Sequence, residues 1–203
     1  MSTQQVATMS NSSKLPIVLV HGIWNRAEIF TTLKTYLEAN DHVVYALTMT
    51  PNNGDALLES LARQLATFID SRLAPQQQFN LLGFSMGGLV SRYYVQRLGG
   101  LSRVEKFVTV STPHRGTFLA LGSDRPGIRQ MCPNSDFIKA LNQDADCLKV
   151  LQFFSFWTPF DLLILPPWSS LIGSGQTRRL LIPSHNRMIR DQQALFVIAQ
   201  ALA

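Results

Sequence analysis

The chain has 203 residues, of which 46% are hydrophobic and 15% are charged, so it can bury a sizeable core, which excludes a disordered chain and a small disulfide-stapled scaffold. Its net charge is +5, but the thirteen arginines and five lysines are scattered, and only Arg178 and Arg179 are adjacent. No basic run alternates with aromatic side chains, so we expect no nucleic-acid partner. Contact with an anionic lipid surface is a weaker alternative to ordinary surface arginines.

Residues 1–14 are rich in Ser, Thr, Gln and Asn and lack the apolar core of a signal peptide, so we expect a polar tail and a cytoplasmic protein. No apolar run reaches the roughly eighteen residues of a membrane-spanning helix. Cys132 and Cys147 lack zinc-ligand spacing, which speaks against a structural metal site. A disulfide between them is an alternative to the reduced thiols of a cytoplasmic chain.

Buried strands and amphipathic helices alternate over the first 110 residues. Apolar runs predict strands at 16–20, 42–48, 79–82 and 104–110. Apolar positions three and four residues apart predict helices at 28–39, 55–73 and 86–98, and Gly54 with Asp55 is expected to cap the second helix. This alternation is typical of βαβ units, in which helices cover both faces of a mostly parallel sheet.

The alternation stops at residues 117–149, where glycines and prolines separate two short helix-like pieces. We expect this stretch to be a small lid-like insert between two strands. A strand at 150–157, a short strand at 178–182 and a closing helix at 187–202 complete the prediction. No repeat or linker divides residues 15–203, so the sequence predicts a single domain that contains the insert.

The residues at 83–87 read Gly-Phe-Ser-Met-Gly, a Gly-x-Ser-x-Gly pattern between a predicted strand and a predicted helix. Such a turn presents its serine from a strained backbone, and the small flanking residues keep neighbouring atoms clear. The alternative is a glycine-rich turn used only for packing, which the flanking strand and helix disfavour. Ser85 is therefore predicted to be a nucleophile.

A nucleophilic serine needs a base and a third group that orients the base. In the fold class with a strand-Ser-helix turn the chain order is Ser, acid, His, which leaves His114 and His185 as bases. Glu105, the only acid between Ser85 and His114, begins a strand, so we predict His185 as the base. We expect His114 to be a loop residue near the pocket, satisfied by backbone or water. Asp161 is predicted as the orienting acid because it alone directly follows a strand.

The oxyanion of the reaction needs two N–H donors. The N–H of Met86, directly after the nucleophile, is predicted as the first. The second is expected from Ile23, in the loop after the first strand, where Gly22 allows close approach.

Three further residues lie beside this predicted site. His21 is interpreted as a structural histidine that braces the loop after the first strand. Trp24 and Phe118 are expected to form apolar substrate-binding walls, although core packing explains such aromatic side chains almost as well.

These features together resemble the α/β-hydrolase superfamily, and more narrowly the small bacterial lipases and esterases. The resemblance rests on segments 21–24, 83–88, 111–117 and 157–161 and on His185, and it covers nearly everything from residue 15 onward. It implies a minimal α/β-hydrolase fold that lacks the first two strands of the full fold. It also implies hydrolysis of carboxylic esters, such as acylglycerols and other lipid esters, with no metal or cofactor. Such lipases often have His before the nucleophile, where this chain has Phe84.

The expected reaction proceeds through an acyl-enzyme on Ser85 that water then hydrolyses. An acyltransferase is an alternative, because it would share the acyl-enzyme and pass the acyl group to an alcohol or lipid. A non-catalytic binding module with this fold is a weaker alternative, since no member of the predicted triad is missing. The insert at 117–149 is interpreted either as a lid that gates an acyl pocket and contacts lipid or as a surface decoration.

Overall fold

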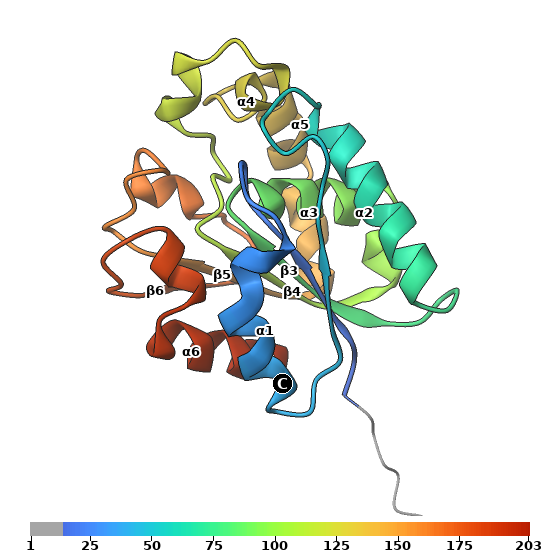
Figure 1. The fold of residues 1–203 in the computed structure, drawn as a ribbon. Coiled ribbons are helices and arrows are strands. Elements are labelled where there is room, and N and C mark those ends of the chain that lie inside the picture. The colour runs from blue at the N-terminus through green and yellow to red at the C-terminus, as the bar shows by residue number, and fades with distance from the viewer. Residues whose placement is uncertain (1–13) are drawn as a thin grey trace, which may run out of the picture.

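The structure is a computed structural model and describes residues 14–203 (Figure 1). The tail predicted at 1–14 lies outside the described residues, except for Lys14. Within the described part the sheet has six strands, all paired in parallel, in the order β2-β1-β3-β4-β5-β6. The predicted parallel sheet with helices on both faces is confirmed.

Most elements fall within a few residues of their predicted positions. The strands are β1 (Ile17–Val20), β2 (Val44–Leu47), β3 (Phe79–Phe84), β4 (Val104–Val110), β5 (Gln152–Trp157) and β6 (Gln176–Arg179). The α-helices are α1 (Thr31–Glu38), α2 (Leu58–Arg72), α3 (Met86–Arg97), α4 (Pro126–Arg129), α5 (Asp136–Gln143) and α6 (Gln192–Leu202). Short 3-10 helices are η1 (Ala27–Phe30), η2 (Gly100–Ser102), η3 (Phe118–Gly122), η4 (Ala145–Val150), η5 (Pro167–Ser170) and η6 (Asn186–Ile189).

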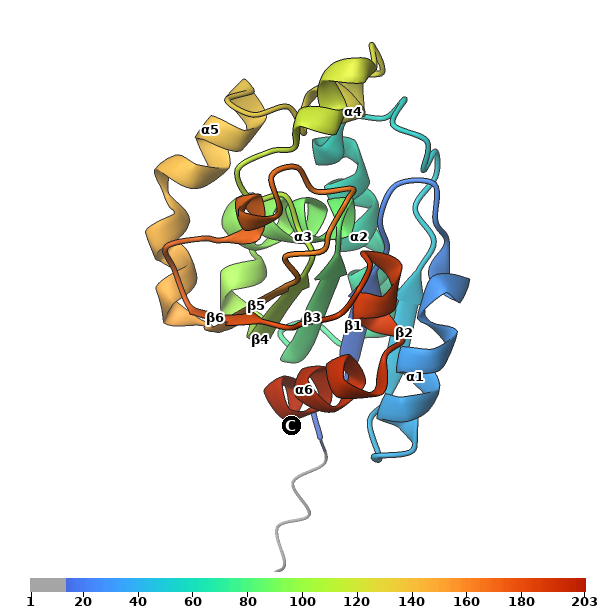
Figure 2. The same ribbon diagram turned by 90° about the vertical axis from the view of Figure 1, so that its left-hand side faces the viewer.

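Helices α1 and α6 cover one face of the sheet, and α2 and α3 cover the other (Figures 1 and 2). Successive side chains of a strand point to opposite faces, so β1 serves both cores. Ile17 and Leu19 pack with α1 and α6, whereas Val18 and Val20 pack with α2 and α3. This burial on both faces explains why the strand is apolar at every position.

The cap predicted for the second helix is wrong. Helix α2 begins at Leu58 rather than Asp55, and the Asp55 carboxylate accepts instead from Arg125 Nη1 at 2.8 Å. The Leu58 N–H donates to the side chain of Gln130, at 2.7 Å from Oε1, so the insert supplies the cap. A tertiary contact between residues 72 positions apart thus replaces the local signal of Gly54 and Asp55.

The end of the chain also departs from the prediction. The last strand lies at 176–179 rather than 178–182, and the closing helix is divided into η6 and α6. Asp191 causes this division, because its side chain accepts from the Gln193 N–H and caps a new helix.

Two further findings concern residues 14–203. Cys132 and Cys147 are both free thiols, so the alternative of a disulfide between them does not hold in this structure. Within this part of the chain, every helix falls short of the length and apolar character that crossing a bilayer requires.

Candidate active site

The candidate site lies at the carboxyl ends of β1 and β3. From β1 the chain proceeds to the neighbouring β2 on one side, and from β3 it proceeds to β4 on the other. Ligands of open parallel sheets bind at such a switch point, where the connections diverge. The loop at 21–25 and the turn that carries Ser85 therefore face the same space.

Ser85 occupies a sharp turn between β3 and α3, with φ 56° and ψ −127°. This conformation costs energy for a residue with a side chain and needs support from its surroundings. The Ser85 N–H donates to Val110 O at 2.9 Å, and its carbonyl accepts from Gly88 N at 3.0 Å. A side chain at Gly87 would collide with the backbone carbonyl of Val20. The Gly-x-Ser-x-Gly spacing is thus explained by close backbone packing around a strained serine.

Asp161 and His185 form a buried hydrogen-bonded pair, with 2.7 Å between Oδ2 and Nδ1. The second carboxylate oxygen accepts from the N–H groups of Leu163 and Ile164 at 2.9 and 3.0 Å. Because an ionised carboxylate only accepts, the proton of the neutral imidazole lies on Nδ1, and Nε2 is left to accept a proton. The Phe84 ring packs on the imidazole at 4.7 Å between ring centroids. Phe84 therefore supports the orientation of His185.

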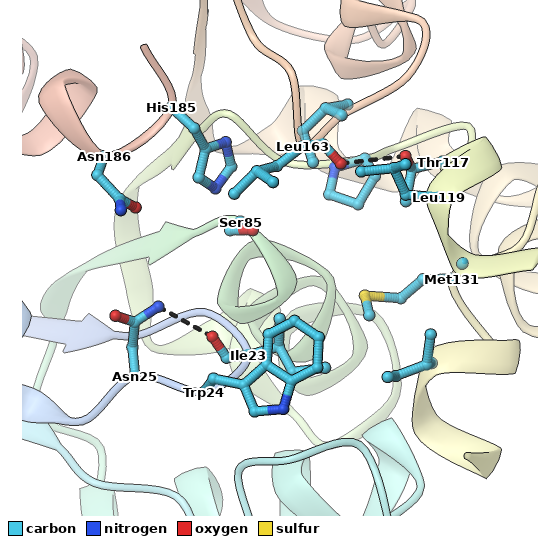
Figure 3. Close-up of a pocket in the computed structure, with 14 residues that line it drawn as sticks. Ile23, Trp24, Asn25, Ser85, Thr117, Leu119, Met131, Leu163, His185 and Asn186 are labelled. Carbon is cyan, nitrogen blue, oxygen red and sulfur yellow. Dashed lines mark hydrogen bonds between the residues drawn. The ribbon is translucent and has the colours of Figure 1, made fainter. Parts of the chain in front are cut away.

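Ser85 and His185 line one cavity of about 270 Å³, and the imidazole points toward Ser85 (Figure 3). The structure thus brings together Ser85 and the Asp161–His185 pair. Most of the other lining side chains are apolar: Ile23, Trp24, Pro113, Leu119, Ala120, Ile128, Met131, Leu163 and Ile164, with Asn25, Thr117 and Asn186 as the polar ones. Among residues 14–203, no three His, Cys, Asp or Glu side chains are grouped so as to bind a metal ion. The arrangement can hold an apolar chain beside a serine and a histidine.

Trp24 lines the cavity as predicted, but Phe118 does not. Phe118 lies in η3, a tight helix in which neighbouring side chains point in different directions. Its ring is exposed, while Thr117, Leu119 and Ala120 reach the cavity. The expectation of Phe118 as a wall is therefore corrected to Leu119.

The two predicted oxyanion donors lie next to Ser85. Met86 is the first residue of α3, and the first N–H groups of a helix have no intrahelical acceptor. The Gly22 backbone lies so close that an added Cβ would be 2.9 Å from the Ser85 Cβ and 3.3 Å from Oγ. Within the described part of the chain, the N–H of Ile23 donates to no acceptor. Both N–H groups are thus free to bind an oxygen.

Thr158 links the loop of the acid to the loop of the histidine. Its hydroxyl donates to Ile182 O at 2.6 Å, and the side chain is fully buried. Asp161 follows Thr158 by three residues and His185 follows Ile182 by three, so this bond holds the two loops together. Sequence reasoning did not single out Thr158; its place directly after β5 is the signal that could have found it.

His114 lies in the loop after β4, next to the lining residue Pro113, but the partners of its ring differ from the prediction. It is fully buried outside the cavity lining, with Nε2 at 3.0 Å from Thr109 Oγ1 and Nδ1 at 3.4 Å from Arg92 Nη1. Burial and the positive charge of Arg92 hold the pKa of His114 well below its ordinary value. The described partners of its ring are therefore side chains rather than backbone, because the loop turns inward beneath α5, where the Asn142 amide donates to His114 O at 3.0 Å.

A buried arginine attaches the insert to α3, the helix that follows Ser85. Arg92 of α3 is fully buried and donates to Leu141 O at 2.6 Å, Asn142 Oδ1 at 3.0 Å and Gln96 Oε1 at 3.1 Å. Burial lowers the pKa of Arg92 to about 10, so the guanidinium still carries its charge at neutral pH. The sequence shows this residue only as a charge within an otherwise apolar helix face.

The insert is held at its other end as well. Gly127 N–H donates to Gly54 O at 2.8 Å, and Gln130 caps α2. The η3 segment instead contacts the loop before η5: Thr117 Oγ1 accepts from Leu165 N at 2.9 Å, and Phe118 N donates to Leu165 O at 2.8 Å. The part of the insert with α4 and α5 is thus attached to the sheet layers, whereas η3 is attached to a second loop.

The parallel sheet and the strained Gly-x-Ser-x-Gly turn between β3 and α3 are those of an α/β-hydrolase, as the sequence resemblance predicts. A family model described as palmitoyl protein thioesterase matches residues 16–147, and the chain belongs to this family. The matched segment contains Ser85 and both predicted oxyanion donors, whereas Asp161 and His185 lie beyond it.

Two relatives each align with about half of the chain. Palmitoyl-protein thioesterase 3 of Dictyostelium discoideum is 32% identical over 114 residues, which are 53% of this chain and 38% of the relative. A triacylglycerol lipase of Pseudarthrobacter phenanthrenivorans is 28% identical over 117 residues, 54% of this chain and 36% of the relative. The chain therefore aligns with less than two fifths of the length of these curated relatives.

Solved structures share the fold at low sequence identity. The mature form of the Bacillus licheniformis lipase BlEst2 aligns with a TM-score of 0.75 at 16% identity, over 95% of this chain and 94% of that one. Aspergillus fumigatus lipase B aligns with a TM-score of 0.81 at 19% identity, over 95% of this chain and 53% of that one. The minimal α/β-hydrolase fold is thereby confirmed.

Proposed function

We propose that this chain is a serine hydrolase that cleaves fatty acyl esters. Ser85 is the nucleophile, His185 the general base and Asp161 the group that orients the base. The observation that carries the proposal is the buried hydrogen bond between Asp161 and His185 beside a strained Ser85 that lines an apolar cavity.

In this proposal the Ser85 hydroxyl attacks the substrate carbonyl and its proton passes to Nε2 of His185. The Asp161 carboxylate stabilises the resulting imidazolium through Nδ1. The N–H groups of Met86 and Ile23 bind the oxyanion, and each such donor contributes about 10²- to 10³-fold to kcat. The imidazolium then gives its proton to the leaving group, and water, activated by the same histidine, releases the acid from the acyl-enzyme.

The apolar lining supports a fatty acyl chain as the bound part of the substrate. For the leaving group, an acylglycerol oxygen is the expectation from the sequence. A thioester sulfur is a second candidate, favoured by the family match. Both substrates pass through the same acyl-enzyme, so parallel assays of an alkyl ester and an alkyl thioester of one fatty acid decide between them.

The central test is the Ser85→Ala variant with p-nitrophenyl esters of graded chain length. We expect kcat to fall by at least about 10³-fold because the nucleophile is lost. Ser91→Ala is the matched control: Ser91 is buried in the same helix, and its hydroxyl has no hydrogen-bond partner in the described structure. This control should keep its activity within about twofold. Unchanged hydrolysis by Ser85→Ala would overturn the proposal.

Two measurements separate the alternatives. A fluorophosphonate probe should label the native chain but not Ser85→Ala; a chain that neither reacts nor turns over substrate would be a binding module. Product analysis with added alcohol acceptors detects an acyltransferase, because acyl transfer to the alcohol would exceed release of the free acid.

Three expectations stay predictions from the sequence. They are a cytoplasmic location, contact of the basic chain with anionic lipid, and a gating role for residues 117–149.

A further inference from the structure

Hydrogen bonds fix the orientation of the peptide group that carries the second oxyanion donor. This is the peptide between Gly22 and Ile23, whose carbonyl oxygen lies 2.7 Å from His21 Nδ1 and accepts from Asn25 N at 3.3 Å. The next peptide is held separately, because Ile23 O accepts from the Asn25 side chain at 2.9 Å. In a planar trans peptide the carbonyl and the N–H point in opposite directions. A carbonyl held by His21 therefore turns the Ile23 N–H away from His21.

The tautomer of His21 is set by its second ring nitrogen. The Met49 N–H, just beyond β2, donates to Nε2 at 2.9 Å, so Nε2 carries a lone pair. The proton of the neutral ring therefore lies on Nδ1, which donates to Gly22 O. His21 is fully buried, and this burial lowers its pKa, which favours the neutral ring. Each ring nitrogen thus has one backbone partner and one defined role.

We propose that His21 is a positioning residue for the reaction, which aims the Ile23 N–H at the oxyanion through the Gly22 carbonyl. The inference rests on the proposed function, since an oxyanion forms only if Ser85 attacks a carbonyl. The proposed role differs from the purely structural role that the sequence predicted for His21, in which the residue only stabilises the loop after β1. Bracing requires the bond from Met49 to Nε2, whereas aiming requires the bond from Nδ1 to Gly22.

Two substitutions distinguish the contributions of the hydrogen bonds made by the two ring nitrogens. His21→Asn places an amide N–H donor near the position of Nδ1 and removes the acceptor for Met49. His21→Gln places an amide oxygen near the position of Nε2 and removes the donor to Gly22. We expect His21→Gln to lower kcat by about 10- to 100-fold, with KM changed less than about twofold and Tm close to that of the native chain. His21→Asn should lower Tm more than His21→Gln does, and it should reduce kcat several-fold less than His21→Gln does.

A thionoester substrate, in which sulfur replaces the carbonyl oxygen, tests the oxyanion site directly. Sulfur accepts hydrogen bonds weakly, so the native chain should strongly prefer the oxygen ester. In His21→Gln this preference should fall by about the same factor as kcat, and in His21→Asn it should stay. A purely structural histidine predicts that both variants lose activity in proportion to stability at an unchanged preference, and this result would overturn the proposal.

A measurement on the unsubstituted protein does not depend on the folding of either variant. Nitrogen-15 NMR of the histidine-labelled chain should find His21 protonated at Nδ1, and protonation at Nε2 instead would contradict the inference. Failure of the proposed function is distinguishable from failure of this inference. If Ser85→Ala stays active, the proposed function fails; if Ser85→Ala is inactive while His21→Gln keeps the native kcat and ester preference, only the inference fails.

Discussion

The bottom of the candidate site and its mouth are built from the same loops but have opposite character. We call the polar residues His21, Ser85, Asp161 and His185 the floor, and the exposed apolar residues of the surrounding loops the rim: Trp24, Phe118, Leu119, Leu162 and Leu163. Of the rim residues, Trp24, Leu119 and Leu163 line the cavity. Neighbours in the chain can belong to different sets, since Asp161 is 2% exposed and Leu162 is 77% exposed.

This difference suggests that the floor orients the groups predicted to react, whereas the rim controls how a substrate enters and binds. Floor groups have backbone partners on several sides, such as the two N–H groups that bind Asp161 Oδ1. Catalysis by positioned groups requires such support, because small displacements of the reacting atoms are costly. Rim side chains are exposed and can contact the apolar part of a substrate without affecting the floor. Variants of the floor should therefore mainly lower kcat. Variants of the rim residues that line the cavity should mainly raise KM.

The largest effect is expected from Asp161→Asn. An amide in place of the carboxylate favours the wrong tautomer of His185 and no longer stabilises the imidazolium. We expect kcat to fall about 10³- to 10⁴-fold in steady-state assays of a chromogenic ester. Asp124→Asn, an exposed change in the insert, is the control and should keep the native rate. A loss below about tenfold for Asp161→Asn would break the distinction between floor and rim.

An intermediate effect is expected from Arg92→Met, which tests the attachment of the insert. The change removes the bonds that a buried guanidinium donates to Asn142 Oδ1 and to Leu141 O, which keeps only its bond from Gln96 Nε2, and this loss should lower the free energy of unfolding by about 2–4 kcal/mol. Urea unfolding measures it. The control is Arg97→Met, which breaks a partly exposed pair with Asp144 and should cost no more than about 1 kcal/mol.

The kinetics of Arg92→Met sharpen this prediction. The folded variant should keep kcat on a short soluble ester within about threefold, because Arg92 does not line the cavity. If Arg92→Met is as mild as Arg97→Met, the buried network does not hold the insert.

The smallest effect is expected within the rim itself, from Leu119→Ala and Phe118→Ala. Leu119 lines the cavity and Phe118 does not, so Leu119→Ala should raise KM for a monomeric medium-chain ester by a few-fold while Phe118→Ala stays within about twofold. Both variants should slow hydrolysis of micellar esters if the rim contacts lipid. Equal KM values for the two variants on the monomeric ester would contradict the different placement of their side chains.

Much of the fold could be predicted because it depends on local patterns. Apolar runs and helical spacing located the strands and helices up to residue 110. The chain order of serine, acid and histidine selected His185, the position of Asp161 after a strand selected the acid, and the structure places the two in contact near Ser85. These predictions needed only chain order and periodicity.

The features that were missed depend on contacts between distant residues. Arg92 reads as a surface charge in the sequence, yet it is buried because α5, almost fifty residues further on, supplies its acceptors. Phe118 was placed in the wall because nothing local shows which way a 3-10 turn faces. The link from Thr158 to Ile182 requires knowledge of how two loops meet. Such contacts are determined by tertiary packing rather than by local propensity.

The cap that Gln130 provides for α2 has a consequence for protein engineering. Inserts at this position are attractive to exchange when a new substrate range is wanted, since they form part of the cavity wall through Ile128 and Met131. A graft that omits an equivalent of Gln130 would leave the first turn of α2 without its side-chain acceptor, at a cost of about 1 kcal/mol. Chimeras should therefore transfer the insert together with residues 53–59, so that each new insert is paired with the helix N-terminus that it caps.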